Sequence, residues 1–324
     1  MSTNAVSDTS RSLHGRGTLA GDGGNKNPRR SRHPVILSGG ERPLSPWQRT
    51  GLLAVLFLMG LYFLLPVWWL LVSSTKNSGE LFSSFGFWFG NHVNFMENLR
   101  QLFSYDNDVF MRWIVNTLLY AGVGAAIATL FAAAAGYTFA KFDFFGKRLA
   151  FSLVLGGMMI PVTALALPLY LTFNSIHATN TYWSVFLPSL VSPFGVYLAR
   201  IYASTGVPNE LLDAARIDGA REWRVFTSVG LRLMGPSLVT IMLFQFVTIW
   251  NNFFLPLVML SNDRLYPVTL GLYQLDSVST YGGAPPDVFG MLVMGVLISV
   301  VPLIVAFLLL QRFWRGGVSA GGLQ

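Results

Sequence analysis

Residues 207–226 read VPNELLDAARIDGAREWRVF, a charged stretch that separates two apolar runs, Trp183–Ile201 and Pro236–Leu260. A helix of about 20 apolar residues is long enough to cross the hydrocarbon core of a bilayer, which is roughly 30 Å thick. Because lipid offers no hydrogen bonds to the backbone, apolar runs of this length form helices. The stretch is therefore predicted to be a surface loop that joins two transmembrane helices.

The same pattern extends to the rest of the chain. Four further apolar runs of similar length are Leu52–Val72, Trp113–Phe139, Leu149–Leu171 and Val288–Leu310. The 324-residue chain is 52% hydrophobic and only 11% charged, whereas an average soluble domain has roughly 25% charged residues. This composition excludes both a soluble globule and a disordered chain. The sequence predicts an all-α polytopic membrane protein with six transmembrane helices.

Basic residues indicate how these helices are oriented. Of the 22 Lys and Arg residues, eighteen lie in the N-terminal stretch, near the second and fourth loops and in the C-terminal tail, and the other four are Lys76, Arg100, Arg112 and Arg264. Cytoplasmic loops carry the excess of Lys and Arg, so both termini are predicted to be cytoplasmic. We expect a disordered cytoplasmic tail over 1–48, a six-helix domain over 49–315 with a cytoplasmic loop at 202–235, and a cytoplasmic tail over 316–324.

Several kinds of chemistry are disfavoured by what the sequence lacks. There is no cysteine, and the four histidines are scattered without metal-ligand spacing, so we predict no catalytic residue and no metal site. No phosphate-binding Gly-x-x-x-x-Gly-Lys-Ser/Thr loop occurs. The net charge of +7 reflects topology, so no nucleic-acid partner is expected. No ionisable residue lies near the centre of a predicted span, which disfavours an ion-coupled secondary transporter. That alternative stays open because carbonyl and hydroxyl groups can bind Na⁺.

Small residues recur every four positions in the second span, at Gly124, Ala128, Ala132 and Gly136. This spacing places them on one helix face, where small side chains let another helix approach closely. We interpret the ridge as a helix-packing surface.

The quoted stretch is predicted to form a helix, a turn and a second helix. Residues 209–217 are good helix formers after Pro208, Gly219 can adopt the left-handed conformation that ends a helix, and a short second helix is expected over 220–229. Ala214 and Ala215 would then form a shallow exposed surface beside charged side chains. Such a surface suits docking of another protein; the alternative is an amphipathic loop that lies on the membrane.

Asp213-Ala214-Ala215, followed by Gly219 and a hydrophobic helix, resembles the EAA loop of ABC-importer permeases. The segments 116–118, 135–142 and 250–257 and the tail 311–321 are similar to the carbohydrate-uptake branch, and the tail resembles that of the maltose-type second permease. The resemblance covers about residues 50–324. Asp213 departs from the pattern, because it stands where the family has Glu.

The resemblance implies a type I ABC importer permease fold in the inner or plasma membrane of a bacterial or archaeal cell. It implies a permease subunit without enzymatic activity of its own, in a binding-protein-dependent importer of a sugar or oligosaccharide. The expected partners are a second permease subunit, an ABC ATPase dimer that binds ATP and Mg²⁺, an extracytoplasmic solute-binding protein and membrane lipid. The expected ATPase-coupling residues are Glu210, Asp213, Ala214, Ala215, Asp218 and Gly219.

Two further sets of residues are candidate contacts. Amide and aromatic groups bind sugars, so Asn116, Gln245, Trp250, Asn251 and Asn252 are candidates for the substrate path, with hydrogen bonding between helices as the alternative. Tyr281, Gly282 and Gly283 in an external loop are candidate contacts with the binding protein. An ABC importer for a non-sugar solute, such as a polyol or a glycerol phosphodiester, also stays open.

Overall fold

The computed structural model of the chain describes residues 45–281 and 287–318, which contain helices and no strand. The elements are α1 (Pro46–Ser73), α2 (Ser78–Ser83), α3 (Phe95–Ser104), α4 (Val109–Leu118), η1 (Leu119–Val123), α5 (Gly124–Lys141), α6 (Lys147–Met159), α7 (Val162–Ser175), α8 (Tyr182–Ser189), α9 (Pro193–Gly206), α10 (Asn209–Ile217), α11 (Glu222–Val225), η2 (Phe226–Gly230), α12 (Leu231–Trp250), α13 (Phe254–Met259), η3 (Asp263–Leu265), α14 (Val268–Tyr281) and α15 (Val288–Val318). The all-α prediction is confirmed.

The chain divides into a unit that ends at Val55 and a unit that begins at Leu56. In the first unit, the structure describes the beginning of α1. Ser45 and Gln48 form reciprocal hydrogen bonds, because the Ser45 N–H donates to Gln48 Oε1 at 3.0 Å and the Gln48 N–H donates to Ser45 Oγ at 3.3 Å. This capping box satisfies N–H groups that have no acceptor within the helix.

Five stretches of helix within the described residues are long and apolar enough to cross a membrane: Pro46–Ser73, Val109–Lys141, Tyr182–Gly206, Glu222–Trp250 and Val288–Gln311. A sixth crossing is counted if α6 and α7 form one span, although the two helices meet at an angle of 104°. The prediction of six helical spans is therefore met by these five stretches and the bent pair, although Tyr182–Gly206 consists of two helices, α8 and α9, that are separated at residues 190–192.

The third predicted span, Leu149–Leu171, is not one continuous helix. It breaks at Ile160 and Pro161, both of which have extended backbones with ψ of 122° and 130°. The ring of a proline disfavours the helical conformation of the residue before it. Pro161 therefore ends α6 at Met159, and the chain changes direction before α7 begins.

The fifth predicted span, Pro236–Leu260, is displaced in the structure. Its helix begins at Glu222 and ends at Trp250, and α13 follows as a separate short helix. The expected second helix of the loop, over 220–229, is thus the first part of this span. Hydropathy locates apolar residues, so it does not indicate that the helix begins in the charged segment at Glu222. It also does not indicate that the helix ends before Asn251, where ψ is 4°.

The predicted small-residue ridge on α5 packs against neighbouring helices, with α9 near Ala132 and Gly136 and with α8 and α12 near Gly124. Gly124, Ala128, Ala132 and Gly136 are all buried. A Cβ added to Gly136 would lie 2.5 Å from Ala199 Cβ and 2.6 Å from the backbone nitrogen of Arg200. Helices α5 and α9 could not come this close with a larger residue at position 136, so the ridge is confirmed as a packing surface.

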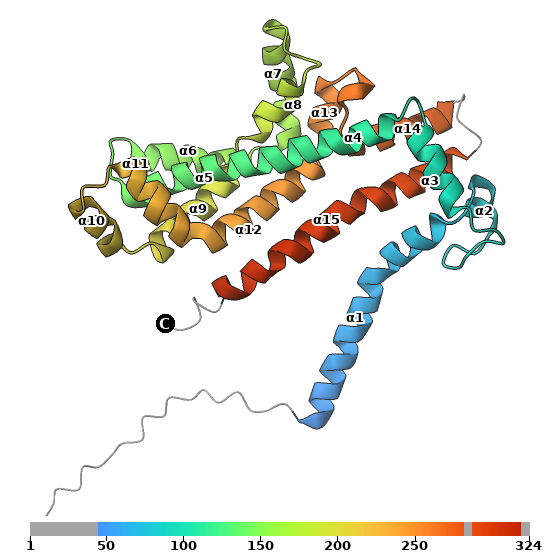
Figure 1. Cartoon of the computed structure of the whole chain (residues 1–324), viewed down its shortest axis with the longest axis horizontal. Helices are drawn as coiled ribbons and strands as arrows, with labels where there is room; N and C mark the ends of the chain where they lie inside the picture. The colour runs from blue at the N-terminus through green and yellow to red at the C-terminus, as the bar shows by residue number, and fades with distance from the viewer. Residues whose placement is uncertain (1–44, 282–286, 319–324) are drawn as a thin grey trace, which may run out of the picture. The chain divides into compact units, whose positions relative to one another are not determined.

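Two hydrophobic cores lie within the unit that begins at Leu56. One includes Phe110, Trp113, Trp250, Leu275 and Met291. The other includes Tyr137, Ala199, Leu212, Val225 and Met234. Figure 1 shows α10 and α11 at one end of the long helix formed by α4, η1 and α5, with α3 and α14 at its other end. The second core therefore supports the end that carries α10.

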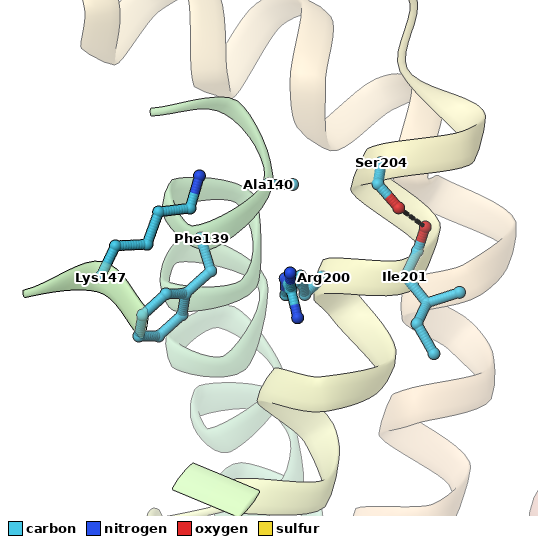
Figure 2. Close-up of a pocket in the computed structure, with 6 residues that line it drawn as sticks. All are labelled: Phe139, Ala140, Lys147, Arg200, Ile201 and Ser204. Carbon is cyan, nitrogen blue, oxygen red and sulfur yellow. Dashed lines mark hydrogen bonds between the residues drawn. The ribbon is translucent and has the colours of Figure 1, made fainter. Parts of the chain in front are cut away.

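A pocket of about 330 Å³ opens near the same end, between α5, the beginning of α6 and α9. Figure 2 shows the side chains that line it, among them Phe139, Lys147 and Arg200. Its lining thus combines an aromatic ring with two cationic groups.

Candidate functional site

The α10 loop, defined here as residues 207–222, leaves α9 and leads into α11. Pro208, with φ of −63° and ψ of 138°, stands directly before α10. Proline lacks an N–H group, and this costs nothing here because the first N–H groups of a helix have no intrahelical acceptor. The predicted helix is therefore present, and it begins at Asn209.

Gly219 ends α10 in the left-handed conformation, with φ of +81°. The Gly219 N–H donates to the Arg216 carbonyl and the Ala220 N–H donates to the Ala215 carbonyl, each at 3.0 Å. These two bonds form a Schellman motif, in which a glycine avoids the steric penalty that a Cβ would incur. The predicted left-handed stop is confirmed.

Leu212 anchors α10 to the protein, because its side chain is 1% exposed and belongs to the second core. Glu210, Asp213, Ala214, Asp218 and Gly219 are exposed. The prediction that Ala214 and Ala215 are both exposed is wrong for Ala215, which is half-buried against the second core. It lies three positions after Leu212 and so shares the inward face of the helix.

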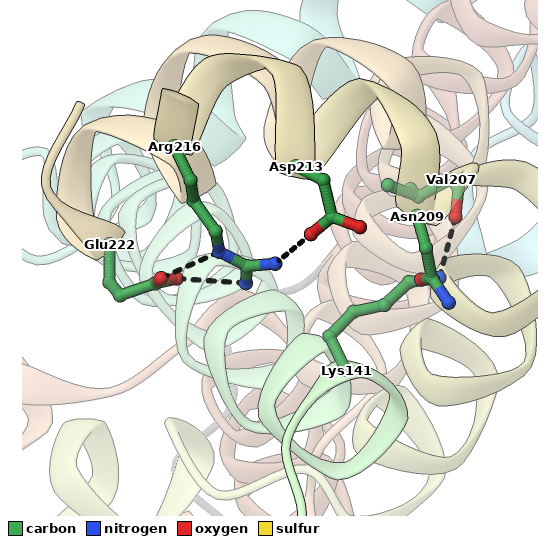
Figure 3. A network of polar contacts seen from close by, with 6 residues as sticks. All are labelled: Lys141, Val207, Asn209, Asp213, Arg216 and Glu222. Atoms are coloured by element: carbon green, nitrogen blue, oxygen red, sulfur yellow. Dashed lines mark hydrogen bonds and ion pairs between the residues drawn. The ribbon is translucent and has the colours of Figure 1, made fainter. Parts of the chain in front are cut away.

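A network of ion pairs ties the end of α10 to α11 (Figure 3). Arg216 Nη1 donates to Asp213 Oδ1 at 2.7 Å. Its Nε donates to Glu222 Oε1 at 2.7 Å and its Nη2 to Glu222 Oε2 at 3.2 Å. The guanidinium thus forms two parallel hydrogen bonds with the Glu222 carboxylate and one with the Asp213 carboxylate on its own helix. This geometry favours one orientation of the Arg216 side chain.

The network orients α10 more than it stabilises the fold. The Arg216 side chain is 34% exposed and those of its partners are 50% and 62% exposed, and exposed pairs contribute about 0–1 kcal/mol each. The hydrogen bonds that Arg216 donates to Glu222 and Asp213 raise the pKa of its guanidinium above the ordinary value. Arg216 therefore stays protonated, and the network keeps its positive centre at any physiological pH.

Lys141, the last residue of α5, holds the beginning of the α10 loop (Figure 3). Its Nζ donates to the Val207 carbonyl at 2.5 Å and to Asn209 Oδ1 at 2.9 Å. The α10 helix is thus held at three places: by Lys141 at its start, by Leu212 in its middle and by Arg216 at its end. These attachments connect α10 to α5, to the second core and to α11.

Lys141, Leu212, Arg216 and Glu222 are not among the predicted site residues, although Arg216 belongs to the charged stretch that the sequence marks out. The three-residue spacing of Asp213 and Arg216 on a predicted helix is a signal for their pairing. No local signal relates Lys141 to Asn209, because the two residues are far apart in the sequence and meet only in the fold.

The α10 loop continues into a long helix without a break. The segment from Glu222 to Trp250 contains α11, the π-helical turn η2 and α12. Gly230 at the end of η2 faces Tyr137, and a Cβ added there would lie 2.9 Å from the Tyr137 ring. The α10 loop is therefore connected to α12 by the continuous helix and to α5 by the Lys141 contacts.

Asn116, a predicted substrate-path residue, is buried and bonded within the chain. Its Nδ2 donates to the carbonyls of Arg264 and Tyr266 at 2.9 and 3.0 Å, and its Oδ1 accepts from the Tyr182 hydroxyl at 2.9 Å. Both amide hydrogens are therefore used. These bonds fasten the segment before α14 to α4.

The other four candidates for the substrate path have different surroundings. Gln245 is buried and donates to Ser192 Oγ, and Trp250 is 1% exposed and packs on Phe246. Asn251 is exposed, and Asn252 is half-buried. The structure thus leaves Asn251 and Asn252 more accessible to a solute than the other three candidates.

Of the predicted binding-protein contacts, Tyr281 is the last residue of α14. Gly282 and Gly283 lie outside the described residues, as do residues 1–44 of the tail predicted over 1–48 and residues 319–324 of the tail predicted over 316–324. Within the described residues, no group of three His, Asp or Glu side chains is arranged to hold a metal ion.

Residues 108–316 match a protein family described as the binding-protein-dependent transport system inner membrane component. The match covers the α10 loop and the helices on both sides of it. The fold also resembles the crystal structure of a chain from a bacterial ABC transporter involved in the import of the acidic polysaccharide alginate. The TM-score is 0.70 at 18% identity, with 83% of this chain and 98% of that chain covered.

Relatives of known description include two arabinooligosaccharides transport system permease proteins, AraQ. The one from Bacillus subtilis is 31% identical over 277 residues, which cover 85% of this chain and 96% of the relative. The one from Halalkalibacterium halodurans is 35% identical over 229 residues, or 71% and 79% of the two chains. The diacetylchitobiose uptake system permease protein NgcG of Streptomyces coelicolor is 28% identical, with 83% and 86% covered.

Proposed function

Since the chain belongs to the family of binding-protein-dependent transport system inner membrane components, we propose that it works as one membrane-spanning half of an ABC importer for a sugar or oligosaccharide. It is a multi-pass protein of the inner membrane and a transport permease subunit. The family match over residues 108–316 carries this proposal, because it contains both the spans and the α10 loop. The same match favours the importer over an ion-coupled secondary transporter.

A sugar cargo is supported by the relatives. Two of them are arabinooligosaccharide permeases and a third is a diacetylchitobiose permease. A lactose transport system permease protein, LacG of Rhizobium radiobacter, is 26% identical over 82% of this chain. These cargoes share hydroxyl groups and pyranose or furanose rings, which amide groups and aromatic faces bind. We propose Asn251 and Asn252 as the most accessible of the candidate contacts along the path.

The partners follow from the same assignment. A second permease chain would complete the path, an external binding protein would deliver the solute, and an ATPase dimer would bind ATP and Mg²⁺. The hydrolysis of ATP is thus assigned to the partner, and this chain contributes no catalytic group. The exposed side chains of Glu210, Asp213, Ala214 and Asp218 would form the surface that meets the ATPase.

The anchoring of α10 explains how this surface could transmit force. When the ATPase subunits close on ATP, a helix held at three places cannot rotate independently of its neighbours. Its displacement would move α12 through the continuous helix that begins at Glu222, and α5 through the Lys141 contacts. Coupling then requires that nucleotide and solute both favour the same one of two arrangements of these helices.

Uptake by proteoliposomes that contain the purified complex tests this function. We expect accumulation of a labelled arabinooligosaccharide or another oligosaccharide that requires ATP and the binding protein. This uptake should persist when ionophores collapse the ion gradients. Uptake that needs an ion gradient and proceeds without ATP would contradict the proposal, and labelled polyols and glycerol phosphodiesters supplied in parallel distinguish the non-sugar cargoes.

A further inference from the structure

Three cationic side chains gather beside the pocket of Figure 2, outside the α10 loop. Lys147 and Arg148 stand at the beginning of α6, and Arg200 projects from α9. The acidic side chain among them, Asp143, is fully exposed and pairs with Lys147 at 2.9 Å. One carboxylate therefore faces three cations, so the cluster carries an excess of positive charge.

Arg148 and Arg200 form no ion pair with any acidic side chain in the described part of the chain. The Arg200 guanidinium lies 3.8 Å from the centre of the Phe151 ring, which is a cation–π contact. Arg200 is half-buried on α9, six residues before the end of that helix and close to the α10 loop. A half-buried guanidinium gains from an anionic hydrogen-bond partner, and no carboxylate of the described residues forms an ion pair with it.

The space beside these cations can accept an anionic group. A second pocket of about 470 Å³ adjoins the pocket of Figure 2, and both are lined by Phe139, Lys147 and Arg200. Arg148, the hydroxyl-bearing Ser152 and the exposed Asp143 that pairs with Lys147 also line the second pocket. A phosphate group has oxygen atoms that two guanidinium groups and a hydroxyl can hydrogen-bond together.

An exposed apolar surface leads away from this pocket along α6, the helix whose first turn carries Lys147 and Arg148. The helix has no buried residue, and Leu149, Leu153 and Met159 are 68%, 69% and 85% exposed. A free phosphate ion has no apolar part that could cover such a surface. The acyl chains of a phospholipid would cover it while the headgroup occupied the pocket.

We propose that the pocket formed by Lys147, Arg148 and Arg200 binds the phosphate of an anionic phospholipid whose acyl chains lie along α6. Basic pockets between transmembrane helices are known to select anionic headgroups. The proposed function places the α10 end of the molecule, and with it this site, at the cytoplasmic leaflet. The inference rests on that function only for the choice of leaflet.

The test is a lipid titration of the full chain, purified together with the subunits that accompany it. The midpoint of thermal unfolding is followed as phosphatidylglycerol or phosphatidylcholine is added in detergent. We expect phosphatidylglycerol to raise the midpoint selectively. The variant with Arg148→Gln and Arg200→Gln should need at least about tenfold more phosphatidylglycerol for the half-maximal shift, because each basic group contributes about 1 kcal/mol to the attraction.

Three further variants and one ion complete the design. Arg221→Gln with Arg224→Gln removes two exposed arginines from the same end of the molecule and should leave the titration unchanged. Arg148→Lys with Arg200→Lys keeps the charge and should retain the selectivity. Arg148→Gln alone leaves the contact of Arg200 with the Phe151 ring in place. It should need a phosphatidylglycerol concentration between those of the unmodified chain and the double Gln variant.

An equal response of the double Gln variant and the unmodified chain would overturn the proposal. So would a full response to inorganic phosphate, which would assign the pocket to a free anion. Neither result depends on transport, so failure here is distinct from failure of the proposed function.

Discussion

The backbone angle φ of Gly219 determines how the exposed side of α10 is placed relative to α11. The angle of +81° closes the Schellman motif, and a Cβ added to Gly219 would meet no atom within 4 Å. The cost of a larger residue at this position is therefore conformational and not steric. Ala220 and the start of α11 follow directly, so a change in this angle would redirect the chain between α10 and α11.

We predict that Gly219→Val abolishes uptake while the protein still inserts into the membrane. The left-handed conformation costs a β-branched residue about 1 kcal/mol or more, which is enough to misplace α10 without unfolding the spans. The control is Gly206→Val, which also enters open space but at an ordinary backbone angle. Uptake and membrane content are measured for both variants, and normal uptake by Gly219→Val would refute a rigid α10.

A substitution of Asn116 tests whether this polar residue of the spans stabilises the fold or contacts the transported solute. We predict that Asn116→Ala lowers the free energy of unfolding by about 2–4 kcal/mol, because it leaves buried carbonyl groups without donors. The exposed Asn251→Ala should change it by less than about 0.5 kcal/mol. Thermal unfolding and the KM for uptake are measured together. A raised KM for Asn116→Ala at unchanged stability would instead make Asn116 a contact of the cargo.

At the scale of elements, the ion-pair network joins α10 to the helix that runs from Glu222 to Trp250. We predict that Arg216→Ala lowers stability by less than about 1 kcal/mol, because the pairs are exposed. It should nevertheless reduce uptake by about tenfold, a loss within the usual range of coupling energies between sites. The stimulation of ATP hydrolysis by the loaded binding protein should fall in parallel.

The control for this variant is Arg221→Ala, which removes an exposed arginine of the same loop that forms no ion pair within the described residues. Its uptake should stay near that of the unmodified chain. A similar loss in both variants would show that the overall charge of the loop matters and that the Arg216 contacts do not.

The helices also show how far the sequence could be interpreted. Hydropathy predicted the spans, because bilayer thickness fixes the length of an apolar helix that crosses it. The end of α10 at Gly219 was predictable because it depends on a single backbone angle. The break at Ile160 and Pro161 was missed, although Pro161 was its local signal. The Lys141 contacts with Val207 and Asn209 were not predictable, since they require the packing of α5 against α9.

At the scale of the whole molecule, the uneven distribution of Lys and Arg predicts which end faces the cytoplasm. The chain has no cysteine, so single-cysteine variants report on one position each. We predict that a membrane-impermeant maleimide labels Ser104→Cys in intact cells and labels Ala214→Cys only after permeabilisation. Both positions are exposed, and they belong to α3 and α10 at opposite ends of the molecule (Figure 1). Labelling in the opposite order would invert the predicted topology.

The central claim, that the exposed face of α10 meets the ATPase, is tested most directly by cross-linking from the same two variants. A photoactivatable maleimide is attached to Ala214→Cys or Ser104→Cys in the assembled complex, and the captured protein is identified by mass spectrometry. We predict that Ala214→Cys captures a subunit containing Gly-x-x-x-x-Gly-Lys-Ser/Thr and that Ser104→Cys does not. Capture of that subunit from Ser104→Cys alone, or from neither position in a complex that contains it, would contradict the account.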